Sequence, residues 1–178
     1  MVCQLSSFKK QLVTLVMTKK IFLKISILVV ALIPFSTNEG DAQSLMLNNF
    51  ERSKLSILSK SKSHEFLVEK AKTERQQSQG LMFRRRLASN GGMLFLFPAV
   101  KVLKMWMKNT YLPLDMLFIN ADGRIVNIVQ RTVPGSLETI SSVEPAMAVL
   151  EVNGGTTSRL KIQKGDRVRH HAFRINYD

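Results

Sequence analysis

The fold of this chain is decided by the stretch Leu114-Asp115-Met116-Leu117-Phe118-Ile119-Asn120-Ala121-Asp122-Gly123-Arg124-Ile125-Val126. An apolar segment, interrupted only by Asp115, is followed by a polar turn and then by a second apolar segment. Asp-Gly readily adopts the positive φ values that tight hairpins need. The stretch therefore predicts two antiparallel strands, over residues 114–119 and 124–133.

Similar short apolar segments, bounded by turn residues, recur along the chain. The segment at 93–97 holds five apolar residues ended by Pro98, which predicts a strand that is buried on both faces. The remaining strand candidates lie at residues 64–70, 103–107, 147–152 and 167–175. About seven short strands predict a mainly β fold, a small antiparallel β barrel or sandwich.

One or two short helices are expected to accompany these strands. Thr73-Glu74-Arg75-Gln76 has the spacing of a capping box, and Gly80 stands where a helix commonly ends. These signals predict a helix over residues 74–79. A second helical turn is predicted within 157–163.

The beginning of the chain resembles an export signal. A basic segment at 17–24 precedes eleven mostly apolar residues at 25–35, too short a run to span a bilayer comfortably. We predict a signal peptide over 1–42, with Met17 as a possible start and cleavage before Gln43; an uncleaved membrane anchor is the alternative. A flexible tether is predicted over 43–63 and a single β domain over 64–178. The mature chain would be periplasmic or secreted, with no transmembrane span.

Cysteine content and charge limit the chemistry of the mature chain. Cys3 is the only cysteine, so no disulfide, thiolate nucleophile or cysteine metal site is expected after cleavage. Residues 43–178 keep 21 basic and 11 acidic side chains, which favours anionic partners. Nucleic acid is not expected, because export argues against it and no aromatic residues alternate with the basic run 84–86.

Several motifs together resemble the domain of unknown function 192 family. In chain order they are Gly80-Leu81-Met82-Phe83-Arg84, Gly92-Met93-Leu94-Phe95, Trp106-Met107-Lys108-Asn109-Thr110, Pro113-Leu114-Asp115, Phe118-Ile119, Asp122-Gly123, Ile125-Val126, Leu150-Glu151-Val152-Asn153-Gly154-Gly155 and Lys164-Gly165-Asp166. The resemblance spans about residues 65–170. It implies a compact, mostly β domain, common in bacteria and archaea and often exported, and it implies no activity. The chain departs from the pattern at Met105 and at Gly154-Gly155.

The segment 105–115 holds the only Trp of the chain beside donors and charges. Alternation along a strand would send Trp106 and Met107 to opposite faces, so we expect one of them in the core. Lys108 and Asn109 are candidate ligand donors at the following corner. The alternative is that Asn109 only ties down the loop and that Lys108 is solvated.

Asp115 and Glu151 are carboxylates within strongly apolar segments. A buried charge is expensive unless it is paired, so each is expected to have a partner or a purpose. The two could form an acid–base pair for hydrolysis, as in glycosidases. The alternative is that each makes a structural ion pair, with Lys108, Arg84 or Arg124 as partners.

Other catalytic signatures are missing from the sequence. We find no nucleophile elbow, phosphate loop or dinucleotide fingerprint, and His170-His171 is a weak hint of a metal. No metal and no cofactor are therefore expected.

The sequence favours a non-catalytic binding or accessory module for an anionic or polar ligand, either a glycan or a small molecule. The expected cleft is lined by Trp106, Lys108, Asn109, Asp115 and Glu151, with Arg84 at its rim. Two alternatives stay open: a hydrolase that uses Asp115 and Glu151, and a structural envelope protein without a ligand. The sequence does not indicate an oligomeric state.

Overall fold

The computed structural model describes residues 49–60 and 62–173 of the chain. The predicted signal peptide and residues 43–48 of the predicted tether lie outside the described residues. Within the described part, no helix is long and apolar enough to cross a membrane. All strands and helices named below belong to one structural unit of the chain.

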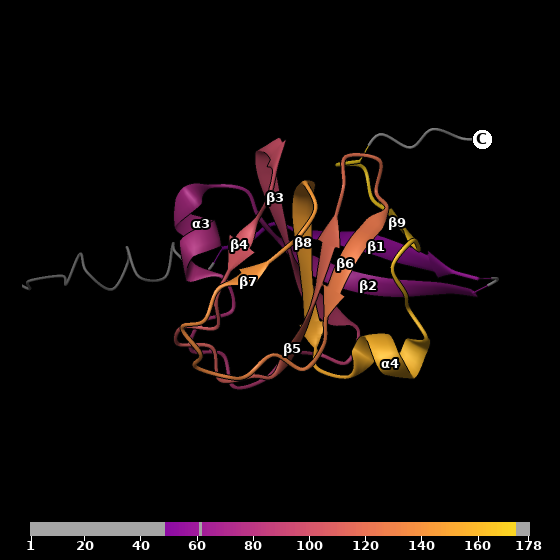
Figure 1. Cartoon of the computed structure of the whole chain (residues 1–178). Helices are drawn as coiled ribbons and strands as arrows, with labels where there is room; N and C mark the ends of the chain where they lie inside the picture. Colours follow the sequence, from indigo (N-terminus) through magenta and orange to yellow (C-terminus); the bar gives the residue numbers. More distant parts are fainter. Residues whose placement is uncertain (1–48, 61, 174–178) are drawn as a thin grey trace, which may run out of the picture. The chain divides into compact units, whose positions relative to one another are not determined.

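Seven strands form one sheet in the order β6-β5-β8-β3-β2-β1-β9 (Figure 1). Their bounds are β1 Arg52–Ser59, β2 Lys62–Ala71, β3 Gly91–Lys101, β5 Leu114–Ile119, β6 Ile125–Val129, β8 Ala146–Asn153 and β9 Arg167–Arg169. A small second sheet pairs β4, Lys104–Met105, with β7, Ile140–Ser141. Two short helices, α3 at Glu74–Gln79 and α4 at Thr156–Leu160, complete the described elements. The prediction of a mainly β fold is confirmed.

The sheet curls on itself without closing. Its edge strands β6 and β9 approach each other at one end, where an isolated bridge joins Arg124 to Arg167. The hydrogen bonds Ile125 N–H to Asp166 O and Val168 N–H to Gly123 O strengthen this corner. The result is a curled half-barrel rather than the closed barrel or sandwich that we expected.

The sheet is also mixed rather than purely antiparallel. β2 and β3 run parallel, with Leu67 opposite Gly91 and Ala71 opposite Phe95, whereas the other strand pairs are antiparallel. A parallel pair needs a long crossover, and the segment 72–90, which includes α3, supplies it. The alternation of apolar residues in β2 and β3 carries no information about this direction.

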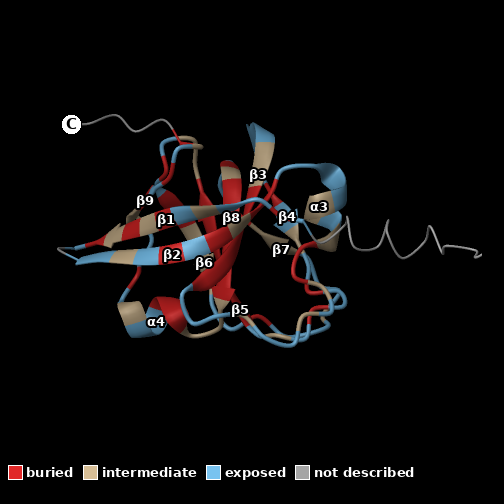
Figure 2. Ribbon diagram, turned by 180° about the vertical axis from the view of Figure 1, so that it is seen from behind, coloured by how far each residue is buried: buried red, intermediate tan, exposed pale blue. Residues whose placement is uncertain are grey.

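Two apolar clusters cover the two faces of the sheet. The cluster inside the curl joins residues from β1 to β9 and includes Ile57, Val68, Leu117, Leu150 and Val168. The other cluster lies beneath α3, the small sheet and the loops near them, and it includes Met93, Phe95, Met116 and Val149. β5, β8 and residues 91–95 of β3 are therefore largely buried on both sides, whereas the end of β3 at 98–101 is exposed (Figure 2). The prediction of two-sided burial is confirmed for residues 93–95.

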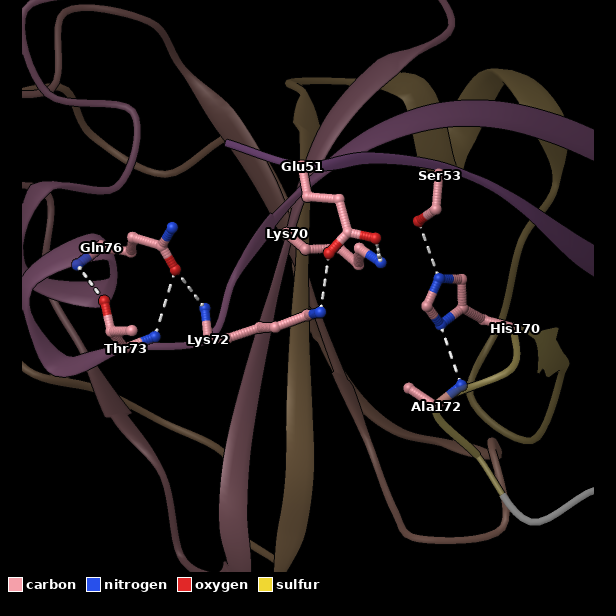
Figure 3. Close-up of polar contacts among 8 residues, drawn as sticks. All are labelled: Glu51, Ser53, Lys70, Lys72, Thr73, Gln76, His170 and Ala172. Atoms are coloured by element: carbon pink, nitrogen blue, oxygen red, sulfur yellow. Dashed lines mark hydrogen bonds and ion pairs between the residues drawn. The ribbon is translucent and has the colours of Figure 1, made fainter. Parts of the chain in front are cut away.

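The helix predicted over 74–79 is present with those bounds. Gln76 N–H donates to Thr73 Oγ1, and the Gln76 side chain accepts from the backbone N–H of Thr73, so the capping box is complete (Figure 3). Gly80 follows with φ 47°, and a Cβ at this position would lie 3.1 Å from the Phe95 ring. Glycine thus lets the end of α3 sit directly on β3.

The tether predicted over 43–63 was wrong for residues 52–59, which form β1. Leu55 and Ile57 alternate with polar residues, point into the curl and are almost completely buried. Phe50 is buried as well, so the domain begins before His64. Two apolar residues spaced two apart are too weak a pattern to predict a strand. β1 pairs with β9, which is distant from it in sequence, and with β2, whose pairing its local pattern does not indicate.

The predicted end of the third strand at Pro98 was also wrong, because β3 continues to Lys101. Proline cannot donate to a neighbouring strand. The ladder between β3 and β8 shifts its register between Leu96 and Lys101, and Pro98 lies within this irregular part. The strand can therefore continue through Pro98, because no regular hydrogen bond to β8 is required at this position.

Replacing Ile57 tests whether β1 belongs to the core. Because its side chain has no exposed surface, Ile57→Ala should destabilise the protein by about 2–4 kcal/mol in urea unfolding. Lys54→Ala, on the exposed side of the same strand, is the control and should change stability by less than about 0.5 kcal/mol. Equal small effects for both variants would mean that β1 contributes no core packing.

Candidate functional site

A pocket of about 360 Å³ opens beside α3, between this helix, β3, β4 and the loop after β4. We name it the α3 pocket. Its lining combines two carboxylates and two lysines with aromatic and methionine side chains. The residues are Glu74, Gln77, Ser78, Gln79, Gly80, Leu81, Met82, Phe95, Phe97, Lys104, Met105, Trp106, Lys108, Thr110 and Glu151.

The register of the central strands places Glu151 in this pocket. On β8, Glu151 lies opposite Met93 of β3 and Met116 of β5, so its side chain extends from the same sheet face as theirs. A side chain at position 92 would bring a Cβ within 2.7 Å of the Glu151 carbonyl oxygen. Gly92 therefore permits the close approach of β3 and β8 at this point.

The Glu151 side chain faces the pocket, and its carboxyl group has no partner among the described residues. The residue is only 4% exposed, and among residues 49–60 and 62–173 the structure contains no hydrogen bond or ion pair to its carboxyl oxygens. Burial raises the pKa of Glu151 from an ordinary 4.5 to about 8, because the low-dielectric surroundings disfavour the charged form. At neutral pH the group is a carboxylic acid that can donate a hydrogen bond into the pocket.

Trp106 and Lys108 form the exposed side of the pocket. The Trp106 side chain is 51% exposed, and Lys108 Nζ lies 5.2 Å from the centre of its ring, which is a cation–π contact. Met107, between them, is fully buried and accepts a hydrogen bond from Thr132 Oγ1 through its sulfur at 3.2 Å. The expected division of Trp106 and Met107 between two environments is present, although the strand itself covers only Lys104–Met105.

Asp115 lies outside the α3 pocket and has a different environment. It is fully buried opposite Val152, on the sheet face away from Glu151. Its Oδ1 accepts from the N–H groups of Arg131 and Gly155, both at 2.9 Å. Its Oδ2 accepts from the N–H and the hydroxyl of Thr157, at 2.8 and 2.7 Å.

These contacts make Asp115 the cap of α4. Gly155 precedes the helix and offers no side chain, so a carboxylate from β5 satisfies N–H groups of the first turn instead. Its partners are backbone N–H groups and the Thr157 hydroxyl, rather than the cation of the ion-pair alternative. Asp115 and Glu151 extend from opposite faces of the sheet, so the structure does not bring the proposed acid–base pair together.

The other two predicted residues also lie outside the pocket. Asn109 has φ 55°, its carbonyl accepts from Phe83 N–H at 2.8 Å, and it serves as a loop residue. Arg84 makes a two-pronged ion pair with Glu69 and lies 5.7 Å from the ring of Phe50. Arg84 lines a separate hollow of about 230 Å³ together with Arg52 and Arg86.

Sequence reasoning missed the wall of the pocket. Phe95 and Phe97 line it from β3 and Gln77 from α3, while Lys104 lies at its mouth. A signal was available for the two phenylalanines, since side chains two residues apart on a strand share a face. All five residues at 93–97 are apolar, which favours a fully buried strand and masks this spacing.

A second polar group surrounds His170 (Figure 3). Ala172 N–H donates to Nδ1 at 3.1 Å, so this nitrogen carries no proton, and Nε2 donates its proton to Ser53 Oγ, 2.8 Å away. Burial, with a smaller effect of His171, lowers the pKa of His170 to about 4. Both ring nitrogens are occupied, and no cluster of three or more metal-ligating side chains occurs among the described residues.

The same view shows a buried lysine beside this group (Figure 3). Lys70 is 2% exposed, and its ammonium group pairs with Glu51, which also accepts from Lys72 Nζ at 2.8 Å. The two lysines lower the pKa of Glu51 to about 2. Unlike Glu151, the buried Lys70 is therefore paired, and its contacts explain its presence without a ligand.

Replacing Asp115 should destabilise the protein because it leaves three buried or half-buried N–H groups without an acceptor. We expect Asp115→Ala to lower the free energy of unfolding by about 3 kcal/mol or more, measured by urea denaturation. Asp122→Ala, at an exposed turn, is the matched control and should have little effect. A near-neutral Asp115→Ala would contradict the capping role.

The Glu151 pKa predicts a specific dependence of stability on pH. Between pH 4.5 and about 8 the folded protein keeps a proton that the unfolded chain releases, so stability falls as pH rises through this window. The loss amounts to up to about 5 kcal/mol. Glu151→Gln cannot ionise, so its stability advantage over the native protein should grow from pH 5 to pH 8.5 in urea unfolding.

The exposed Glu138→Gln is the control, and its stability should follow that of the native protein at every pH. Parallel pH curves for Glu151→Gln and the native protein would show that Glu151 is ionised in the fold.

Comparison with known proteins places the chain among uncharacterised relatives. The model of the domain of unknown function 192 (DUF192), described as an uncharacterized ACR, matches residues 56–170. A crystal structure of a Sinorhizobium meliloti 1021 protein, described as a candidate transcription regulator, is 44% identical with a TM-score of 0.69, covering 70% of this chain and 98% of that one.

A second crystal structure, of a protein of unknown function from Novosphingobium aromaticivorans DSM 12444, is 36% identical with a TM-score of 0.68. The match covers 69% of this chain and 88% of that one. The search of curated proteins found no match.

Proposed function

Because the chain belongs to the DUF192 family, which is described as uncharacterized, we propose from its own residues that the α3 pocket binds a small anionic or polar molecule. The protein would act as a non-catalytic binding or accessory module. The sequence of residues 1–42 supports a place outside the cytoplasm, either in the periplasm or after secretion.

The observation that carries this proposal is the unpaired Glu151 carboxyl in a pocket with an aromatic wall. A buried carboxyl group without a partner reduces stability, and nothing in the packing around it explains why it is present. Such a group is accounted for if a ligand supplies the missing hydrogen bond. Trp106 offers a flat apolar surface, and Lys104 and Lys108 attract negative charge to the mouth.

Of the predicted ligand residues, the proposal keeps Trp106, Lys108 and Glu151. It does not keep Asp115, Asn109 and Arg84, because each of them serves another contact. A hydrolase is not proposed, since its acid and base would lie on opposite faces of the sheet. A structural envelope protein is the outcome if no ligand is found.

The description of the Sinorhizobium meliloti protein suggests nucleic acid as a rival partner. The two helices of the described residues span six and five residues, which is little to insert into a major groove. We therefore expect only weak, salt-sensitive binding to duplex DNA.

The proposal is tested by a thermal-shift screen of sugars, sugar acids and organic anions, followed by calorimetry on any compound that stabilises the protein. A ligand at a hundred times its Kd should stabilise by about 2.7 kcal/mol. Lys108→Ala should weaken an anionic ligand about tenfold while changing unfolding stability by less than about 0.5 kcal/mol, because Lys108 is exposed.

Lys54→Ala removes a lysine from a distant exposed position and should leave ligand affinity unchanged. If Lys54→Ala weakens the ligand as much as Lys108→Ala, general charge attraction and not the pocket is responsible. If no compound in the screen stabilises the native protein, the binding proposal is contradicted and the structural role is favoured.

A further inference from the structure

The polar groups of the α3 pocket are separated by depth. Glu151 is buried in the pocket, whereas Lys104 and Lys108 are exposed at its mouth. No ion pair joins Glu151 to Lys104 or Lys108 among the described residues. A ligand can therefore be held at two different points.

The charged groups that face Glu151 can be assigned to each surrounding element. β3 and β5 place the uncharged Met93 and Met116 beside it. α3 contributes Glu74 to the pocket, and β4 with its following loop contributes Lys104 and Lys108. The inner end of the pocket thus presents a neutral hydrogen-bond donor, and its mouth carries two positive charges against one negative charge.

Part of the pocket lining is apolar. It includes Phe97 of β3 and Met105 of β4, and Trp106 extends the apolar surface toward the mouth. Because Lys108 already lies over the Trp106 ring, this ring is occupied by a cation and is a poor site for a positively charged ligand. A flat, uncharged molecular body suits this wall better.

We infer that the α3 pocket binds an aromatic or similarly flat organic acid that carries a second, uncharged acceptor such as a ketone. Its acid group binds Lys104 and Lys108, its body packs against Phe97 and Trp106, and its acceptor receives a hydrogen bond from the Glu151 carboxyl. This inference rests on the proposed function and names the ligand class for the same pocket.

Three probes of similar size separate these contacts: 4-acetylbenzoate, which has both groups, benzoate, which lacks the ketone, and acetophenone, which lacks the acid. None of them titrates between pH 6 and pH 9. Titration of the 15N-labelled protein by NMR at pH 6 should give 4-acetylbenzoate an affinity at least about tenfold higher than either control, in line with about 1–1.5 kcal/mol per added hydrogen bond.

The higher affinity of 4-acetylbenzoate relative to benzoate should also depend on the protonation of Glu151. At pH 9 the advantage of 4-acetylbenzoate over benzoate should fall about tenfold, because the pKa of Glu151 is about 8 and only the protonated acid donates. Glu151→Gln retains an N–H donor, so it should keep the advantage at both pH values. Glu151→Leu should lose it at both, and Glu138→Gln should behave like the native protein.

The outcomes distinguish this inference from the pocket proposal. Equal affinity for acetophenone and 4-acetylbenzoate would overturn the role of the lysines. If the ratio of the affinities for 4-acetylbenzoate and benzoate does not change with pH in the native protein, Glu151 is not the hydrogen-bond donor to the ketone. If none of the probes binds but the wider screen finds a ligand weakened by Lys108→Ala, the ligand class is wrong while the pocket proposal survives. If nothing binds in either experiment, both fail.

Discussion

The pairing of β8 between β3 and β5 is the constraint on which the rest of the structure depends. Both faces of β5, of β8 and of the first half of β3 are buried, so the side chains there face one of two apolar clusters. The register sends Asp115 to one face and Glu151 to the other. Asp115 lies against the start of α4 and accepts hydrogen bonds from its N–H groups, whereas Glu151 lines the pocket and has no polar partner among the described residues. The register of one strand pair thus places the two carboxyl groups on opposite faces, where Asp115 caps α4 and Glu151 lines the α3 pocket.

The sequence predicted those parts of the fold that local chemistry determines. The capping box marked α3 correctly, and Asp122-Gly123 marked the turn between β5 and β6. The parallel pairing of β2 with β3 was beyond prediction, because strand direction is decided by the crossover and not by the alternation within either strand. β1 was missed because most of its stabilisation comes from neighbours distant in sequence.

The site was predictable to a similar degree. Trp106, Lys108 and Glu151 stood out as unusual residues for their surroundings, and the structure brings all three to one pocket. Asp115 looked equally unusual, but its partners are mainly backbone N–H groups, which every residue except proline carries and no sequence pattern identifies. The sequence can therefore identify a carboxylate whose burial would reduce stability, but only the fold shows whether other groups of the protein donate hydrogen bonds to it.

Glu151 keeps its proton at neutral pH because its side chain is buried and has no partner among the described residues. The most direct measurement is the 13C chemical shift of its side-chain carboxyl carbon, followed by NMR from pH 4 to pH 10 and assigned with Glu151→Gln. We predict a single titration with a midpoint near pH 8. A midpoint near the ordinary value of 4.5 would contradict the account, because it would mean that the carboxylate is ionised and stabilised within the fold.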